Sequence, residues 1–113
     1  MDSILTSIKK LLGISKDYKQ FDDDIIIHIN TVLMNLTQLG VGPEEGFFIE
    51  DEYAEWFDFV DTEETAQFNA VKTYIYLKVK LLFDPPLSSS VLESINRTIS
   101  ELEWRLNVAA EPE

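Results

Sequence analysis

The chain has 113 residues, of which 45% are hydrophobic and 27% are charged, and this composition fits one folded domain and excludes a wholly disordered chain. It has no cysteine and a single histidine, which excludes disulfides, thiolate metal sites and cysteine nucleophiles. The net charge of −12 disfavours binding to phosphate backbones, because nucleic-acid affinity depends on lysine and arginine.

The negative charge is concentrated in the middle of the chain. Between Gln20 and Val71 there are 13 acidic residues and no lysine or arginine, whereas the remaining residues are close to neutral. This distribution is compatible with a solubilising surface, with a surface that repels DNA, or with a surface that meets a basic partner. All three roles remain open from composition alone.

The first predicted element is a short amphipathic helix that starts after Asp2 or Ser3 and stops at Gly13. Either of the two polar residues can cap its start, and Lys9 and Lys10 suit the negative end of its dipole. Its apolar residues recur at steps of three and four and comprise Ile4, Leu5, Ile8, Leu11 and Leu12.

A second helix is predicted from Asp23 to Leu39, with Asp22 as its N-cap and Gly40 as its stop. The Asp22–Asp24 run lies at a helix start, where carboxylates complement the positive dipole end, and we interpret it as helix stabilisation and not as a metal site. The buried stripe consists of Ile25, Ile26, Ile29, Val32, Leu33, Leu36 and Leu39.

The segment from Gly40 to Asp61 has a different pattern. Its glycines and Pro43 indicate an irregular loop, and the aromatic and β-branched residues that follow favour strands. We predict a β-hairpin with strands at 47–49 and 54–60 around an acidic turn at 51–53. A short helix from Glu52 to Phe59 is the alternative, since the alternation of apolar and polar residues fails at Phe57.

Two longer helices complete the pattern. The third begins near Asp61 or Thr62 and ends before Pro85, and it is apolar over so much of its circumference that we expect it to be central. The fourth begins at 88–90, with Ser90 and Glu93 as a capping box, and ends near Asn107. Its core-facing seam is Leu92, Ile95, Ile99, Leu102 and Leu106.

The predicted fold is therefore mainly α: a four-helix bundle with a short β-hairpin or irregular insertion between helices 2 and 3. Residues 1–107 form a single helical domain, and 108–113 form a flexible C-terminal tail. No stretch approaches the roughly 20 apolar residues that a membrane-spanning helix needs, so we expect no membrane partner.

No catalytic residues, metal ligands or cofactors are predicted, and we expect the chain not to be an enzyme. His28 lies in an isoleucine-rich run, where a core or solvent-edge histidine is the simpler interpretation than a general base. The loop from Gly40 to Gly46 follows a helix, contains Pro43 and is flanked by acids, unlike a phosphate-binding loop. Docking to other proteins is the function class that remains.

The aromatic side chains of the acidic segment are the strongest candidates for docking, because one small core has limited room for them. The candidate partner or subunit interface comprises Phe47, Phe48, Ile49, Tyr53, Trp56, Phe57 and Phe59. We expect Trp56 to serve assembly more than folding, with packing at the end of the bundle as the alternative.

Four sequence features occur together in a recognisable order. They are Ile4–Ile14, Asp24–Asn30 followed by Gln38–Pro43, Ala70–Val79 ending in Leu82–Pro86, and Ile99–Asn107. In combination they resemble the small head–tail connector, or adaptor, proteins of long-tailed bacteriophages and prophages, over nearly the whole chain. The resemblance implies a helical subunit that assembles as a ring, a dodecamer in that family, beneath the portal. Such a ring extends the DNA channel and supports the next neck protein.

The resemblance also implies roles for particular residues. The acidic surface would line or rim a channel that DNA crosses without binding, and it comprises Glu44, Glu45, Glu50, Asp51, Glu52 and Glu55. The tail residues Val108, Ala109, Ala110 and Glu111 would dock on the portal. The expected location is the virion neck, after synthesis in the bacterial cytoplasm. The alternative is an acidic DNA mimic that inhibits a nucleic-acid-binding enzyme, which the composition alone also permits.

Overall fold

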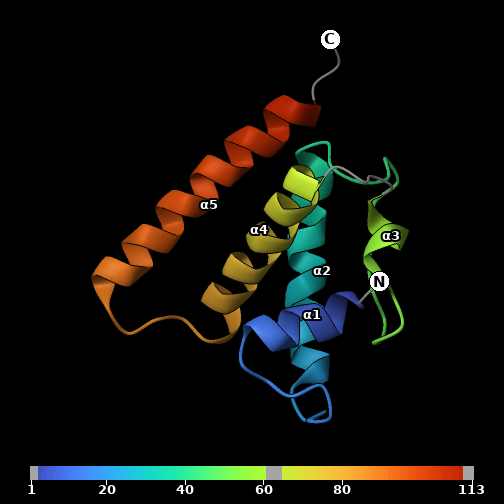
Figure 1. Ribbon diagram of the computed structural model, residues 1–113, viewed down its shortest axis with the longest axis vertical. Coiled ribbons are helices and arrows are strands. Elements are labelled where there is room, and N and C mark those ends of the chain that lie inside the picture. Colours follow the sequence, from blue (N-terminus) through green and yellow to red (C-terminus); the bar gives the residue numbers. More distant parts are fainter. Residues whose placement is uncertain (1–2, 61–64, 111–113) are drawn as a thin grey trace.

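The computed structural model describes residues 3–60 and 65–110, which form five helices (Figure 1). They are α1 (Ile4–Leu11), α2 (Asp22–Gln38), α3 (Trp56–Phe59), α4 (Thr65–Phe83) and α5 (Ser89–Ala110). The mainly helical fold class is confirmed. The only β-type pairing in the described ranges is an isolated bridge between Ser3 and Glu55.

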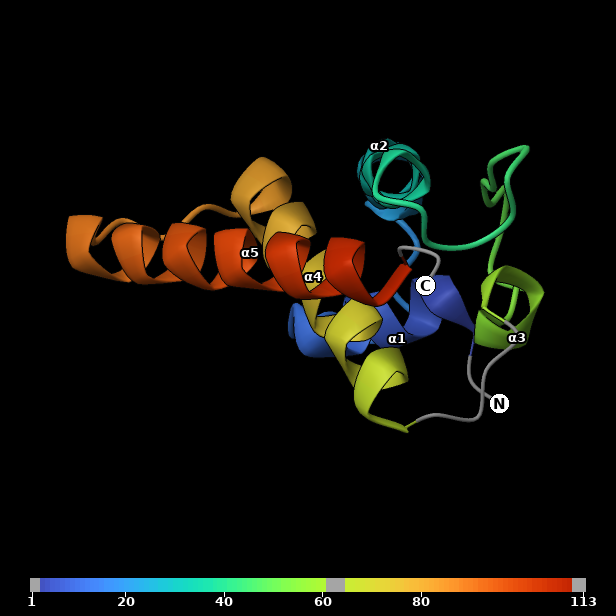
Figure 2. The same cartoon turned by 90° about the horizontal axis from the view of Figure 1, so that it is seen from above.

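Helix α4 is the centre of the subunit, as its apolar circumference predicted. It contacts α1, α2 and α5, and its buried face includes Val71, Tyr74, Ile75 and Val79. Helix α2 runs alongside α4, and α1 crosses the lower end of α2 (Figure 1). Helix α5 covers α4 from the opposite side and projects well beyond the other helices when the molecule is viewed from above (Figure 2).

The predicted apolar faces of the first two helices are confirmed except at Leu11, which is exposed, and Leu92 of the predicted α5 seam is exposed as well. Ser3 caps α1 by accepting a hydrogen bond from the backbone N–H of Thr6 at 2.9 Å. In α2 the buried residues are Ile25, Ile29, Val32, Leu33 and Leu36, all from the predicted stripe. The N-cap of α2, however, is Phe21, and Asp22 is the first helical residue, so the prediction that Asp22 caps this helix is wrong.

The carboxylate of Asp22 binds a lysine of the preceding helix instead. Its Oδ1 lies 2.7 Å from Nζ of Lys9, which is almost completely buried. The same ammonium group donates to the backbone carbonyl of Tyr18 at 2.7 Å and to that of Lys16 at 3.3 Å. Lys9 therefore fastens the α1–α2 connection and the start of α2 together, a role that its position near the end of α1 did not reveal.

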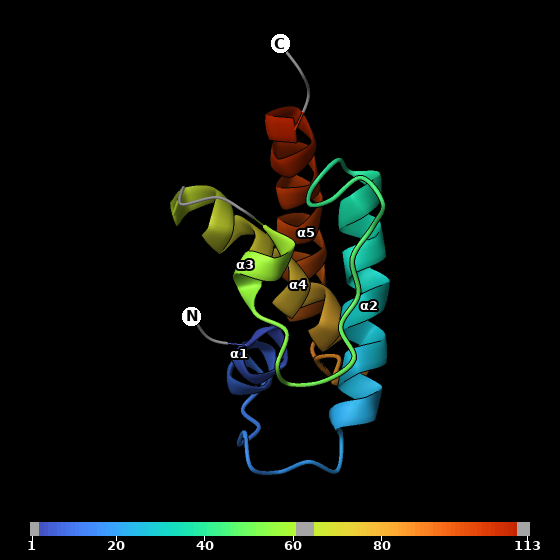
Figure 3. The same cartoon turned by 90° about the vertical axis from the view of Figure 1, so that its right-hand side faces the viewer.

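The predicted β-hairpin is wrong, and the irregular insertion is correct. Residues 47–50 form no strand because a side chain of α2 takes the place of a partner strand: Asn30 accepts from the N–H of Ile49 at 2.7 Å and donates to its carbonyl at 3.0 Å. Residues Trp56–Phe59 form one helical turn, closed by a capping box between Glu55 and Asp58. The alternative short helix is thus right for these four residues. Figure 3 shows the long connection running along α2 before it reaches α3.

Gly42 holds this connection against α3. Its φ is +86°, and a Cβ added here would overlap the ring of Phe59. We expect Gly42→Ala to lower the free energy of unfolding by about 2–4 kcal/mol, from left-handed strain together with overpacking. Gly13→Ala is the matched control, because Gly13 has a similar φ of +83° and open space around it. Urea denaturation of the two variants should show a clearly larger loss for Gly42→Ala, and equal losses would contradict the packing argument.

The C-terminal helix is longer than predicted and its end is docked. Asn107 donates from Nδ2 to the carbonyl of Leu39 at 3.2 Å, and a Cβ added to Gly40 would lie 3.1 Å from that of Ala110. Residues 108–110, which the sequence assigned to a tail, form the last turn of α5. Glu111 and the rest of that tail lie outside the described residues, as does the predicted helix start at 61–64.

The hydroxyl of Tyr74 links α4 to α5, and the hydroxyl of Ser88 caps the start of α5. Tyr74 donates to Oε2 of Glu103 at 2.7 Å, and burial, with Glu103 nearby, raises the pKa of Tyr74, so that it stays protonated and remains a donor. At the start of α5, Ser88 accepts from the N–H of Val91 at 3.4 Å, so the capping serine of this helix is Ser88 and not the predicted Ser90.

None of the helices in the described ranges has the length and hydropathy that crossing a bilayer requires.

Candidate interaction surfaces

The aromatic residues of the acidic segment divide into a buried group and an exposed group. Ile49, Trp56 and Phe59 belong to the core of the subunit, and Phe47 packs against Phe59 with ring centroids 5.3 Å apart. A surface role for these buried side chains is therefore replaced by a core role. Phe48, Tyr53 and Phe57 remain available for docking.

Trp56 is the anchor of α3. Its side chain is 0% exposed, its Nε1 donates to Oγ of Ser7 at 3.0 Å, and its ring packs edge-on against Phe68 with centroids 5.6 Å apart. These contacts attach one turn of helix to both α1 and α4. The expectation that Trp56 serves assembly more than folding disagrees with this geometry, because a completely buried side chain offers nothing to a partner.

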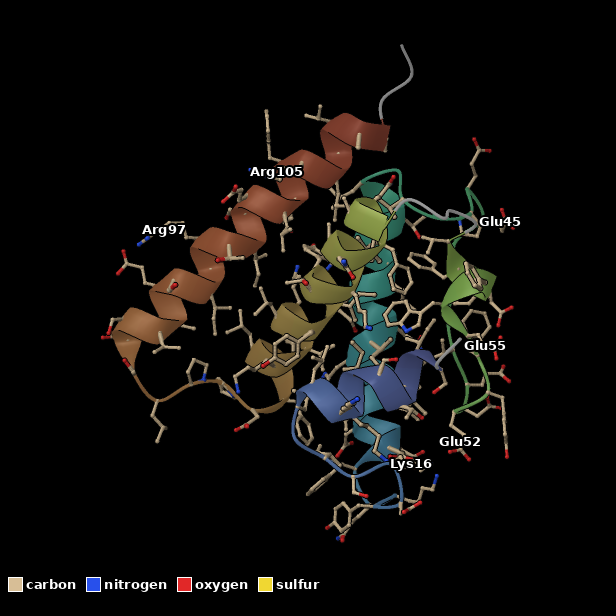
Figure 4. The ribbon with its side chains drawn as sticks, viewed as in Figure 1. Lys16, Glu45, Glu52, Glu55, Arg97 and Arg105 are labelled. Carbon is tan, nitrogen blue, oxygen red and sulfur yellow. The ribbon has the colours of Figure 1, made fainter. Side chains whose placement is uncertain are left out.

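The exposed residues form what we call the acidic aromatic edge, defined as Glu45, Phe48, Glu52, Tyr53, Glu55 and Phe57. Its three aromatic side chains are 65%, 78% and 48% exposed in chain order. Glu45, Glu52 and Glu55 lie along one side of the molecule, at the right of Figure 4. The other predicted acidic residues, Glu44, Glu50 and Asp51, come from the same segment and are exposed.

Few carboxylates of this segment are paired with a cation. Glu52 pairs with Lys19 at 2.7 Å, a contact that raises the pKa of Lys19. Glu55 and Asp58 are used in the capping box of α3, and Asp51 accepts from the N–H of Tyr53 at 2.9 Å. Among the described residues, Glu52–Lys19 is the one ion pair of the predicted acidic surface. The acidic aromatic edge therefore combines a negative charge with exposed aromatic rings.

A second exposed surface lies on α5 and was missed from the sequence. Trp104 is 67% exposed, and Arg97 and Arg105 on the same helix are exposed as well. Helical periodicity would have predicted that Trp104 is exposed, because it falls on the side of the helix opposite the seam formed by Ile99 and Leu106. We call Arg97, Trp104 and Arg105 the α5 face. Figure 4 places its arginines on the side of the molecule opposite the acidic aromatic edge.

The side chains considered for chemistry have structural contacts in the part of the chain that the structure describes. His28 is half-buried and packs edge-on against Phe83 with centroids 6.4 Å apart. A hollow of about 430 Å³ between the α2–α3 connection and α3 contains one carboxylate, Asp58, which is already used in the capping box. In these ranges no three histidine or acidic side chains are grouped as metal ligands.

A small helical subunit with exposed aromatic side chains on two opposite edges has the features of a structural docking protein. A family model described as phage connector protein matches residues 4–113, and the chain belongs to this family. This match confirms the resemblance to phage head–tail connectors and supports a structural role in association with other phage head and tail proteins. Comparison with curated proteins and with solved structures gives no match.

Proposed function

We propose that the chain is a neck subunit that assembles as a ring on the phage portal. The ring, a dodecamer by analogy with the family, extends the DNA channel and supports attachment of the next neck protein. The observation that carries this proposal is the family match over residues 4–113. Two chemically different exposed edges on opposite sides of the subunit support it, since each copy in a ring has a neighbour on either side.

Electron microscopy of the purified protein mixed with its cognate portal tests this function. The expected result is ring-shaped density at the tail-side end of the portal, in an amount that saturates as protein is added. Lack of association at the highest attainable concentration would contradict the proposal. Inhibition of a DNA-binding enzyme, relieved by added DNA, would favour the DNA-mimic function instead.

We further propose that the acidic surface keeps DNA from adhering to the channel. It comprises Glu44, Glu45, Glu50, Asp51, Glu52 and Glu55, without a lysine or arginine between Gln20 and Val71. Phosphates repelled by carboxylates pass without being held, because retention requires cationic contacts. The last turn of α5, with Val108, Ala109 and Ala110, is the proposed portal contact, now as a helix end in place of a flexible tail.

Substitution of acids by lysines tests the channel surface. The triple variant Glu44→Lys, Glu50→Lys and Asp51→Lys should bind double-stranded DNA with an affinity that falls steeply as salt is raised, since each phosphate contact releases counterions. Fluorescence anisotropy of labelled DNA measures this, with the same three positions changed to glutamine as the control. The glutamine variant should bind much more weakly. Equal binding by both variants would show that these positions do not form a continuous surface.

A further inference from the structure

The α5 face has the composition of a protein–protein contact but no partner within the described subunit. Tryptophan and arginine are the residues most enriched at the energetic centres of interfaces. Trp104 exposes most of its indole ring, and both arginine side chains are more than half exposed. Leaving a tryptophan in water forgoes the free energy of burying a large apolar surface, so a covering partner would be stabilising.

The arginines of this face are available to bind further carboxylates. Arg97 contacts Glu93 at 3.5 Å and Arg105 contacts Glu101 at 2.8 Å, both along the same helix. Such exposed pairs contribute little to stability, and each guanidinium has five N–H donors, of which these contacts use a minority. An arginine placed against an aromatic ring and a carboxylate can stack on the first and donate to the second.

The acidic aromatic edge supplies those two kinds of group. It presents aromatic rings at Phe48, Tyr53 and Phe57 and carboxylates at Glu45 and Glu52, with no arginine in the segment. The two surfaces are therefore complementary in chemistry, with unused guanidinium donors and an indole ring on one and carboxylates and aromatic rings on the other. They lie on opposite sides of one subunit, too far apart in the fold to meet each other (Figure 4). A second copy can bring the missing surface to each.

We propose that the α5 face of one copy docks on the acidic aromatic edge of the next copy. Because two different surfaces meet, the contact is head-to-tail, and its repetition closes into a ring when the rotation between copies allows it. This inference rests on the proposed function, which requires copies to assemble, and it specifies the surfaces that meet. In this arrangement Glu45 and Glu52 lie at the boundary between copies, and the proposed channel surface keeps Glu44, Glu50 and Asp51, the positions used in its own test.

Charge reversal on each surface separately is the first half of the test. Arg97→Glu with Arg105→Glu removes the cations of the α5 face, and Glu45→Arg with Glu52→Arg puts two cations on the edge where that face would dock. Glu55 is left unchanged because it caps α3. Each double variant alone should self-associate at least about tenfold more weakly than the unmodified chain. Sedimentation velocity at fixed ionic strength measures this, because salt weakens both the overall repulsion between acidic subunits and the attraction across the contact.

Mixing the two double variants is the decisive half. In an alternating assembly the glutamates introduced on one α5 face meet the arginines introduced on the next edge, and the native arginines meet the native carboxylates at the following contact, so the equimolar mixture should regain self-association. A contact between two α5 faces would leave the Glu45 and Glu52 variant unaffected, and no recovery on mixing would overturn the proposal. Lys10→Glu with Lys16→Glu is the matched control. It changes the net charge as much as the arginine reversals do, at exposed positions outside both surfaces, and should leave association unchanged.

Cross-linking keeps the test decisive when association is weak, because the chain has no cysteine of its own. Glu50→Cys beside the edge and Ser100→Cys on α5 should be joined by a short bismaleimide only when the two single variants are mixed at high concentration. Links within either variant alone, or none in the mixture, would overturn this pairing. Portal rings that persist in the Arg97 and Arg105 variant would overturn it while leaving the proposed function intact. Absence of rings from the unmodified chain would count against the proposed function, whatever the mixing result.

Discussion

Replacing Trp56 with alanine should lower the free energy of unfolding of the isolated subunit by about 3–5 kcal/mol, the range for removing a large aromatic side chain from a core. Trp56 is 0% exposed and packs on Phe68, so its removal leaves a cavity between α3 and the helices beneath it. The variant also deprives the buried hydroxyl of Ser7 of its indole partner, which adds to the loss. Chemical denaturation followed by circular dichroism gives this free energy.

Trp104→Ala is the matched control, because the chain contains two tryptophans and Trp104 is 67% exposed. Its unfolding free energy should stay within about 0.5 kcal/mol of the unmodified chain. If the α5 face docks on a second copy, this variant should lose self-association while retaining stability. A stable Trp56→Ala subunit would show that α3 is not held by the tryptophan and would contradict the core assignment.

Breaking the buried ion pair of Lys9 should have an effect of similar size. Asp22→Ala leaves an ammonium group buried without its counter-ion, which costs about 3–5 kcal/mol for pairs of this kind. Lys9 would still donate to the carbonyls of Tyr18 and Lys16, so we expect the lower end of this range. The α1–α2 connection should loosen first, and hydrogen exchange of its amides should report that loosening together with the global loss of stability.

Two further variants separate the charge effect from the packing effect. The double variant Lys9→Met with Asp22→Leu removes both charges and should recover part of the stability, since an apolar pair can replace a buried ion pair, while the carbonyls of Tyr18 and Lys16 lose their donor. Glu52→Ala removes the exposed pair with Lys19 and should change stability very little. A loss from Asp22→Ala no larger than that from Glu52→Ala would show that the buried position adds nothing.

Helix positions, apolar faces and the central place of α4 were predictable from the chain itself. The reason is that the period of Ile25, Ile29, Val32 and Leu36 depends only on helical geometry, and so does the end of α4 before Pro85. The family was also predictable, because the order of several weak motifs along the whole chain is specific even when each motif alone is not. Helical periodicity and the order of the motifs along the chain were sufficient to predict these features.

The candidate surfaces were only partly predictable. The acidic segment was located correctly from its lack of lysine and arginine, whereas its aromatic residues could not be divided into core and surface. That division depends on which long-range neighbour each ring meets: Trp56 meets Ser7 and Phe68, and Tyr53 meets solvent. Residues three positions apart in one short segment thus have opposite roles.

The helical class, the order of the helices and the position of the excess negative charge follow from composition and local periodicity, and the family follows from the order of the motifs along the chain. The features that involve partners distant in the chain required the folded structure. Asn30 takes the place of a β-strand beside Ile49, Asp22 binds Lys9 instead of capping its own helix, and the end of α5 docks beside Gly40. In each case the contact joins groups far apart in the chain, which the local rules for helices, caps and turns do not describe.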